Sequence, residues 1–256
     1  MGIKKDVQKQ FGRSADSYVT SKGHRKGKDL KKLVEIAQTN RTEQALDIAT
    51  GGGHTANALA PFVQKVIAMD LTIEMLTAAE EFITSNGHHN VDFVQGDAEK
   101  LPFSDGLFDI VSCRIAAHHF PNIETFISEV HRVLKNGGQL LLDDNVASEV
   151  DEFDQFYNHI EKVRDYSHYR AWKKSEWLQM LEVKGFEIQE LHRFEKQFEF
   201  HNWCERMHLS DVEKQALNEL MMQSSESVKS KFRIHIENEQ VISFQGEAML
   251  LRARKR

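Results

Sequence analysis

A short apolar run that ends in a glycine turn constrains this chain more than any other feature. Residues 45–53 read Ala-Leu-Asp-Ile-Ala-Thr-Gly-Gly-Gly, and a segment that permits a helix follows. Glycines at the end of a buried strand let the backbone approach a ligand without interference from Cβ atoms, and the next helix aims its free N–H groups at the same place. The sequence therefore predicts a small-molecule cradle at the start of an α/β core.

Asp47, inside this run, separates two kinds of ligand. A carboxylate at the tip of the strand would repel a pyrophosphate, whereas it would attract a cationic ligand. S-adenosylmethionine is a ligand of the second kind, because it carries a sulfonium and an ammonium group and no phosphate. The competing motif is Gly51-x-Gly53-x-x-Ala56, which fits the dinucleotide fingerprint and keeps a nicotinamide cofactor open as an alternative.

Apolar runs alternate with amphipathic segments along the first half of the chain. This alternation, with continuously apolar strands, is typical of a parallel, doubly wound sheet that is covered on both faces. Beyond residue 146 the pattern changes to longer helices and a final pair of strands, with a polar helical segment at 201–232. The predicted strands are 44–49, 66–69, 91–94, 108–113, 139–143, 186–200 and 241–252, and the predicted helices are 27–39, 54–62, 72–85, 122–135, 150–166 and 174–184.

Two further acids follow predicted strands at positions that suit an adenosine. Asp70 ends the second strand, at about the distance from the glycine turn at which an acid reaches ribose hydroxyls; alternatively it caps the next helix. The block at 96–103, Gly-Asp-Ala-Glu-Lys-Leu-Pro-Phe, follows the third strand. There Asp97 can accept a hydrogen bond from an adenine amine while Leu71 and Ala98 sandwich the ring, or the block is an ordinary turn.

These blocks resemble motifs of the class I S-adenosylmethionine-dependent methyltransferases. The spacing Asp-x-Ala-x-Gly-x-Gly at 47–53 is similar to their motif I, which usually has glycine where this chain has Ala49. We expect Ala49 to keep a negative φ, since alanine disfavours a left-handed backbone. The block at 96–103 resembles Gly-Asp-Ala-x-x-Leu-Pro-Phe of the type 11 family, especially in relatives of the quinone-biosynthesis C-methyltransferases. The resemblance is good over 11–145 and thin afterwards.

The resemblance implies a seven-stranded, mostly parallel Rossmann-like sheet with an added helical cap. It implies S-adenosylmethionine as methyl donor and S-adenosylhomocysteine as product. We expect one methyltransferase domain over 1–256, with lid helices at 1–40, a cofactor-binding core at 41–146, and a substrate-side half at 147–256 that holds the insertion at about 201–232.

The same resemblance implies the residues of the site. In such enzymes the loop after the fourth strand lies beside the sulfonium. His118 and His119 in this loop have ordinary pKa values near 6.5 and are the candidate general bases, although they could equally cap or pack a helix. The residues implied for cofactor binding are Tyr18, Asp47, Ala49, Thr50, Gly51, Gly53, Asp70, Leu71, Asp97, Ala98 and Arg114.

Composition limits the partners. The chain has 33 Lys and Arg against 39 Asp and Glu, a net charge of −6, which argues against a general nucleic-acid binder. Cys113 and Cys204 lie far apart and lack metal-ligand spacing, so we expect no metal and a reducing compartment. With no signal peptide and no run near the roughly 20 apolar residues of a membrane span, we expect a soluble, cytoplasmic protein, as a monomer or homodimer.

Three functions remain open on the sequence alone. The first is transfer of a methyl group from S-adenosylmethionine to a small-molecule acceptor by in-line displacement. The second is an NAD(P)-linked oxidoreductase, which depends on the dinucleotide fingerprint. The third is a non-catalytic protein of the same fold that binds adenosyl ligands.

Overall fold

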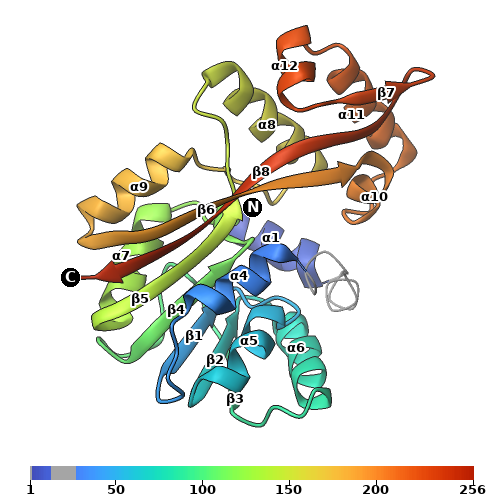
Figure 1. Cartoon of the computed structure of the whole chain (residues 1–256). Coiled ribbons are helices and arrows are strands. Elements are labelled where there is room, and N and C mark those ends of the chain that lie inside the picture. Colours follow the sequence, from blue (N-terminus) through green and yellow to red (C-terminus); the bar gives the residue numbers. More distant parts are fainter. Residues whose placement is uncertain (1, 13–26) are drawn as a thin grey trace.

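The computed structural model describes residues 2–12 and 27–256, and one sheet runs through that part of the chain (Figure 1). Its strands lie in the order β3-β2-β1-β4-β5-β8-β6, and the short β7 pairs with β8. Strands β1 to β5 pair in parallel, whereas β8 runs antiparallel to β5 and β6. The strands are β1 (Gln44–Ile48), β2 (Lys65–Asp70), β3 (Val91–Gln95), β4 (Phe108–Arg114), β5 (Leu134–Asn145), β6 (Phe186–Glu199), β7 (His235–Glu237) and β8 (Gln240–Lys255).

The predicted doubly wound α/β class is confirmed, but the predicted number of strands is wrong. The described part of the chain forms an eight-stranded sheet, and the additional strand is the three-residue β7. Asn238 and Glu239 connect β7 to β8, and both have a positive φ, 48° and 61°. Two such residues make the tight turn that matches the twist of a hairpin. A hairpin this short leaves almost no periodic signal in the sequence.

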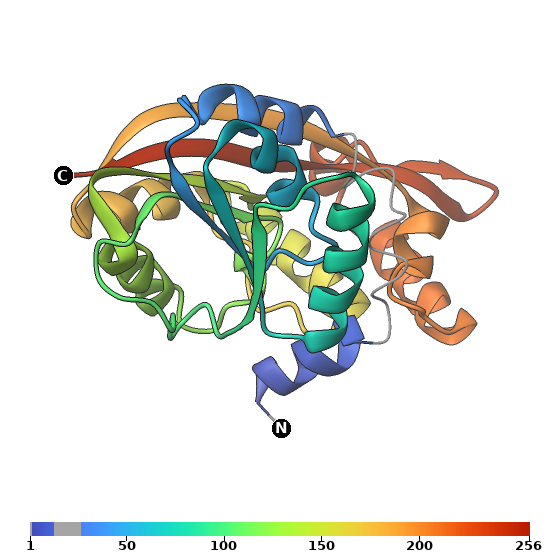
Figure 2. The same ribbon diagram turned by 90° about the horizontal axis from the view of Figure 1, so that it is seen from below.

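Helices cover both faces of the sheet, as Figure 2 shows from below. One apolar cluster joins α4, α5 and the end of α6 to β1 and β2, and a second joins α7 and α9 to β4 and β5 on the other face. The helices are α1 (Ile3–Gly12), α4 (Lys28–Ile36), α5 (His54–Leu59), α6 (Ile73–Ser85), α7 (Ile123–Val133), α8 (Asp151–Arg164), α9 (Lys174–Val183), α10 (Phe200–Glu205), α11 (Asp211–Met222) and α12 (Glu226–Lys231), with 3-10 turns η1 (Ala60–Phe62) and η2 (Ala117–His119).

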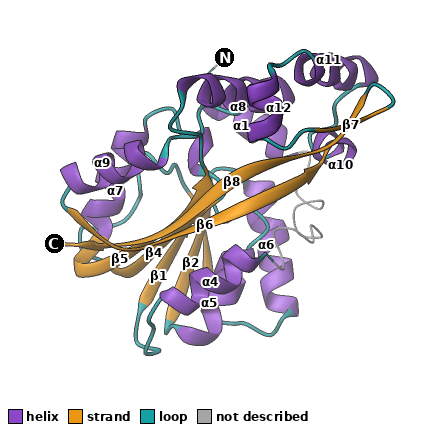
Figure 3. Ribbon diagram, turned by 45° about the horizontal axis from the view of Figure 1, so that its top comes forward, coloured by secondary structure: helices purple, strands orange, loops and turns teal. Residues whose placement is uncertain are grey.

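A third apolar cluster lies under the far ends of β6 and β8. These two strands extend past the parallel strands as a long ribbon, and α8, α10, α11 and α12 pack on it (Figure 3). Trp203 and Phe244 are fully buried there, with ring centroids 4.8 Å apart. The segment predicted as one polar helical stretch is three short helices, because Ser210 and Ser225 each cap a new helix start.

The start of β5 differs from its prediction. The sequence predicted a helix over 122–135 and a strand over 139–143. Instead α7 ends at Val133, and β5 begins at Leu134, which pairs with Phe108 ahead of a register shift. Gly137 has a φ of 78°, and a Cβ on Gly138 would lie 2.9 Å from a backbone oxygen. The glycine pair therefore allows a bulge inside the strand.

Candidate active site

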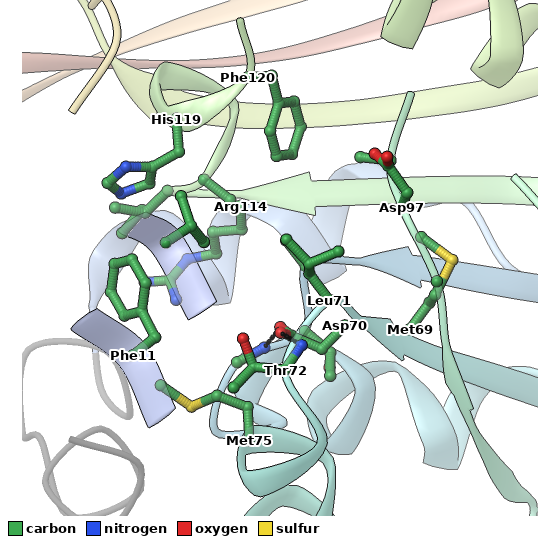
Figure 4. Close-up of a pocket in the computed structure, with 18 of the residues that line it drawn as sticks. Phe11, Met69, Asp70, Leu71, Thr72, Met75, Asp97, Arg114, His119 and Phe120 are labelled. Carbon is green, nitrogen blue, oxygen red and sulfur yellow. Dashed lines mark hydrogen bonds between the residues drawn. The ribbon is translucent and has the colours of Figure 1, made fainter. Parts of the chain in front are cut away.

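A cavity of about 1020 Å³, counted to its open mouth, lies at the carboxyl ends of β1, β2, β3 and β4. Open α/β sheets bind ligands at this edge, where β1 separates strands that wind in opposite directions. The amino-terminal helix α1 adds Lys4, Val7 and Phe11 to the wall. The cavity is therefore bounded by the loops after four strands and by a helix from the start of the chain (Figure 4).

The loop between β1 and α5 lines the cavity with backbone. Ala49, Thr50 and Gly51 all face it. Gly51 has a φ of 53°, and a Cβ there would have no atom within 4 Å, so the missing side chain leaves open space. Gly53 is absent from the lining. Its φ is 79°, and a Cβ would lie 2.9 Å from Cδ1 of Ile83, so this glycine serves the packing of α6.

Asp47 lies behind this loop, outside the cavity lining. Its Oδ2 accepts a hydrogen bond of 2.7 Å from Thr50 Oγ1, and its Oδ1 accepts one of 2.7 Å from Ser112 Oγ. Burial raises the pKa of Asp47 to about 6, and these hydroxyl groups oppose the shift. We expected from the sequence that the Asp47 carboxylate would repel a pyrophosphate directly. Its position behind the loop does not support this expectation. Through these two hydrogen bonds, the Asp47 carboxylate links the loop after β1 to strand β4.

The predicted negative φ of Ala49 is wrong, since its φ is 53°. Ile115 leaves the adjacent strand β4 with the same φ of 53°. Left-handed backbone is uncommon for alanine and exceptional for a β-branched residue, and such conformations are concentrated at functional sites. After these two strands the chain turns to opposite faces of the sheet, to α5 on one and to α7 on the other, which leaves the cavity between the two loops.

Replacing Ala49 by glycine is therefore expected to leave the free energy of unfolding unchanged or to raise it by up to about 1.6 kcal/mol. Removing the left-handed penalty of about 1–2 kcal/mol outweighs or matches the loss of about 0.4–1 kcal/mol through the freer unfolded chain. Denaturant unfolding measures the change. Ala45→Gly is the control, because Ala45 is buried in extended β1 and should lose stability. Equal losses in both variants would contradict the expectation.

Asp70 presents a carboxylate to the cavity at the end of β2. Its Oδ2 accepts a 2.9 Å hydrogen bond from the Gly51 N–H, and its Oδ1 accepts one of 2.9 Å from the Thr72 N–H. Burial raises the pKa of Asp70, and these N–H groups counteract the rise. Thr72 also lines the cavity, and its buried Oγ1 has no hydrogen-bond partner among the described residues. Both expected roles of Asp70, capping and ligand contact, are compatible with this geometry.

The loop after β3 forms one end of the cavity. Asp97 and Ala98 of this loop line the cavity, as does Leu71, which follows β2; Figure 4 shows Leu71 and Asp97. The sequence did not predict the two ion pairs that Lys4 of α1 forms with this loop. The Lys4 ammonium lies 2.6 Å from Asp97 Oδ2 and 2.7 Å from Glu99 Oε2. No local motif connects residues so far apart in the chain.

Arg114 lines the cavity, but its guanidinium forms ion pairs in a buried network. Its Nη2 and Nε donate to Asp29 Oδ2 over 2.6 and 3.1 Å, and Nε lies 3.3 Å from Asp143 Oδ2. Lys196 Nζ lies 3.2 Å from the same Asp29 oxygen. Burial works to raise the pKa of Asp29, yet the two cations hold it well below its usual range. Burial and the Asp29 charge raise the pKa of Asp143 well above its usual range.

The two adjacent histidines occupy different environments. His119 lines the cavity, with its ring 5.1 Å from that of Phe11 in an edge arrangement. His118 is absent from the lining, and its Nδ1 lies 2.6 Å from Asp144 Oδ1. Burial lowers the pKa of His118, but the Asp144 charge and hydrogen bond outweigh burial and raise it overall. Burial and the neighbouring His118 lower the pKa of His119 to about 4.

The remaining sequence predictions concern Tyr18, a metal site and a membrane span. Tyr18 lies outside the described residues. Within residues 2–12 and 27–256, no three or more His, Cys, Asp or Glu side chains gather as they would around a metal ion. None of the helices in those ranges has the length and apolar character needed to cross a membrane. Sequence reasoning also assigned no role to several lining residues, which come from helices, a strand and loops: Val7, Met69, Thr72, Met75, Glu99, Phe120 and Pro121.

The chain matches a known protein family and several known proteins. Residues 46–142 match the family described as a methyltransferase domain. The chain is 38% identical over 248 residues to YcgJ of Bacillus subtilis, named as an uncharacterized methyltransferase, and the match covers 96% of this chain and 98% of YcgJ. The crystal structure of YcgJ superposes with a TM-score of 0.87 at 36% identity, covering 89% of this chain and 98% of that one.

Two more solved structures extend the comparison. A protein of Bacillus halodurans C-125, named as a methyltransferase, is 57% identical with a TM-score of 0.88, and the match covers 90% of this chain and 99% of that one. Phosphoethanolamine N-methyltransferase 2 of Haemonchus contortus shares only the fold, with a TM-score of 0.67 at 17% identity over 100% of this chain and 61% of that one. The motifs, the sheet order and these relatives agree, and the chain belongs to the class I S-adenosylmethionine-dependent methyltransferases of the type 11 family.

Proposed function

We propose that this protein transfers a methyl group from S-adenosylmethionine to a small-molecule acceptor within the cavity at the ends of β1 to β4. The observation that carries the proposal is the Asp70 carboxylate, which faces the cavity while the N–H of Gly51 anchors it to the glycine loop. The Haemonchus relative was solved with S-adenosylhomocysteine, which supports an adenosyl ligand in a cavity of this fold.

The residues present fit such a ligand. An ionised carboxylate accepts about four hydrogen bonds, and Asp70 uses two of them on backbone N–H groups, so it retains capacity for ribose hydroxyls. Leu71, Ala98 and Met69 offer apolar contact to an adenine ring near Asp97. Gly51 leaves room for close approach of the backbone.

The chain contributes to the reaction mainly by holding the acceptor and excluding water. When bound, S-adenosylmethionine supplies an electrophilic methyl group, and correct placement of the acceptor supplies much of the acceleration. At the end of the cavity opposite Asp97, the walls include Phe11 and His119, and Ile115 and Phe120 also line the cavity. This end is where we propose that the acceptor binds, with His119 as the general base. We assign His118, which is absent from the lining, no direct contact with the reactants.

A nicotinamide dinucleotide fits this cavity less well. Its pyrophosphate would bring two negative charges among Asp70, Asp97 and Glu99. The two Lys or Arg side chains that line the cavity within residues 2–12 and 27–256, Lys4 and Arg114, already face carboxylates at 2.6 Å. The charge balance of the wall therefore favours a cationic ligand, although Asp47 itself lies behind the loop.

Calorimetric titration of the protein with S-adenosylhomocysteine and, separately, with NADH tests the proposal. We expect micromolar binding of S-adenosylhomocysteine and no saturable binding of NADH. Transfer of radioactive methyl groups from labelled S-adenosylmethionine to a small-molecule extract then separates an enzyme from a non-catalytic binder. Binding of NADH alone would overturn the proposal, and binding of S-adenosylhomocysteine without any transfer would favour the non-catalytic alternative.

A further inference from the structure

The hydrogen-bond partners of His119 determine which of its ring nitrogens carries the proton. Nδ1 lies 3.0 Å from the backbone oxygen of Ser167 and 3.4 Å from Ser167 Oγ. The Ser167 hydroxyl already donates to Asp165 Oδ1, so both oxygens near Nδ1 can act only as acceptors. Nδ1 must therefore be the donor. In the neutral ring, this leaves Nε2 as an unprotonated hydrogen-bond acceptor.

The charged groups around His119 come from three elements. His118 lies beside it on the same 3-10 turn, with ring centroids 4.2 Å apart, and Asp144 of β5 holds His118 by a 2.6 Å contact. Asp165 and Ser167 approach from the loop after α8, and the uncharged ring of Phe11 meets the His119 ring edge to face. Burial and the His118 charge keep the pKa of His119 near 4, which leaves the ring neutral at pH 7.

Among the residues that the structure describes, the same end of the cavity offers no cation to an anionic acceptor. The Arg114 guanidinium is 4% exposed and faces Asp29 and Asp143. Lys4 faces Asp97 and Glu99 at the other end. The remaining walls, Phe11, Phe120, Ile115, Ala116 and Pro121, are apolar. A ligand here meets aromatic and aliphatic surface with one basic nitrogen.

We propose that the methyl acceptor is a neutral molecule with an O–H or N–H group, and that this group donates its hydrogen bond, and later its proton, to Nε2 of His119. This inference deepens the proposed function and rests on it. In the transfer, the acceptor's oxygen or nitrogen forms the new bond to the methyl carbon as the carbon–sulfur bond breaks, and the sulfonium becomes a neutral thioether. The proton released by the acceptor passes to Nε2, and the resulting imidazolium then loses it to water.

Nitrogen-15 NMR of histidine-labelled protein tests the inference without a known acceptor. With S-adenosylhomocysteine bound at pH 7, we expect His119 to be neutral and to carry its proton on Nδ1. Phenol is the probe for a neutral O–H donor, anisole is the same ring without the donor, and benzoate is an anion. We expect phenol to shift the Nε2 resonance and to bind about threefold to tenfold more tightly than anisole or benzoate, the value of one net hydrogen bond.

Two variants complete the design. His119→Phe keeps an aromatic ring against Phe11 and should remove the preference for phenol over anisole, whereas His89→Phe on the exposed surface should retain it. If His119→Phe fails to fold, the tautomer of His119 and the change in its Nε2 resonance with phenol, both measured on the natural protein, still test the inference. A proton on Nε2, a charged His119 at pH 7, or equal affinity for phenol and anisole would overturn the inference. Failure of S-adenosylhomocysteine to bind would instead contradict the proposed function.

Discussion

Replacing Arg114 by methionine is expected to lower the free energy of unfolding by about 3–5 kcal/mol, the usual loss when one partner of a buried ion pair is removed. The side chains of Arg114 and Asp29 are each 4% exposed, and Asp29 accepts two hydrogen bonds from the guanidinium. Without Arg114, the Asp29 charge stays buried with Lys196 as its remaining cation at 3.2 Å. Urea unfolding of the ligand-free protein measures the loss.

A double variant separates the cost of an orphaned charge from the value of the pair. Asp29→Leu combined with Arg114→Met removes both partners, and buried pairs replaced by apolar groups are often neutral in stability. The double variant also removes the two groups that face the buried Asp143 carboxyl, Arg114 and Asp29, and so leaves one polar group without them. We therefore expect the double variant to recover part of the loss. Arg193→Met is the control, since its side chain is 53% exposed and such pairs contribute less than about 1 kcal/mol. Comparable losses for Arg114→Met and Arg193→Met would contradict this account.

The network also shows where prediction from sequence ends. Periodicity and turn residues located every long strand of the sheet, because buried parallel strands are continuous apolar runs and their ends are marked by glycine and aspartate. Asp29, Arg114, Asp143 and Lys196 come from four separate elements. Nothing in the local pattern of one segment encodes a partner so far away in the chain.

Within the candidate site, sequence spacing predicted which loops meet but not which atoms face the cavity. Asp70, Asp97 and Arg114 do line it, whereas Asp47 lies behind its loop. A strand alternates its side chains between two faces, but the residue that follows it obeys no such period. The left-handed backbone at Ala49 and Ile115 redirects the chain at those points.

The paired histidines illustrate the same limit. His118 and His119 were equivalent candidates in sequence, because both follow β4 and have the same intrinsic pKa. The short 3-10 turn η2 aims one ring at the cavity and the other at Asp144. The loop that carries Ser167 then determines the proton position on His119. Only the packed structure distinguishes the two residues.

Asp70→Asn is expected to weaken binding of S-adenosylhomocysteine about 10-fold to 100-fold, because hydrogen bonds to an ionised group contribute roughly 1.5–3 kcal/mol. Asparagine keeps the shape but has one oxygen, so it can accept from only one of the N–H groups of Gly51 and Thr72, which bond to different oxygens of Asp70. Calorimetry measures the affinity, and thermal unfolding checks the fold. Asp92→Asn on the neighbouring β3 is the matched control, with a side chain that is 57% exposed.

A ligand that lacks one ribose hydroxyl distinguishes a direct contact from a structural one. If Asp70 accepts the ribose hydroxyls, the natural protein should bind S-adenosylhomocysteine more tightly than its 2′-deoxy analogue, and Asp70→Asn should lose much of that preference. If Asp70 only caps the start of α6 through Thr72, the variant should lose stability and keep the preference. The second outcome would remove the observation on which the proposed function depends most, since the glycine loop alone is compatible with a dinucleotide as well.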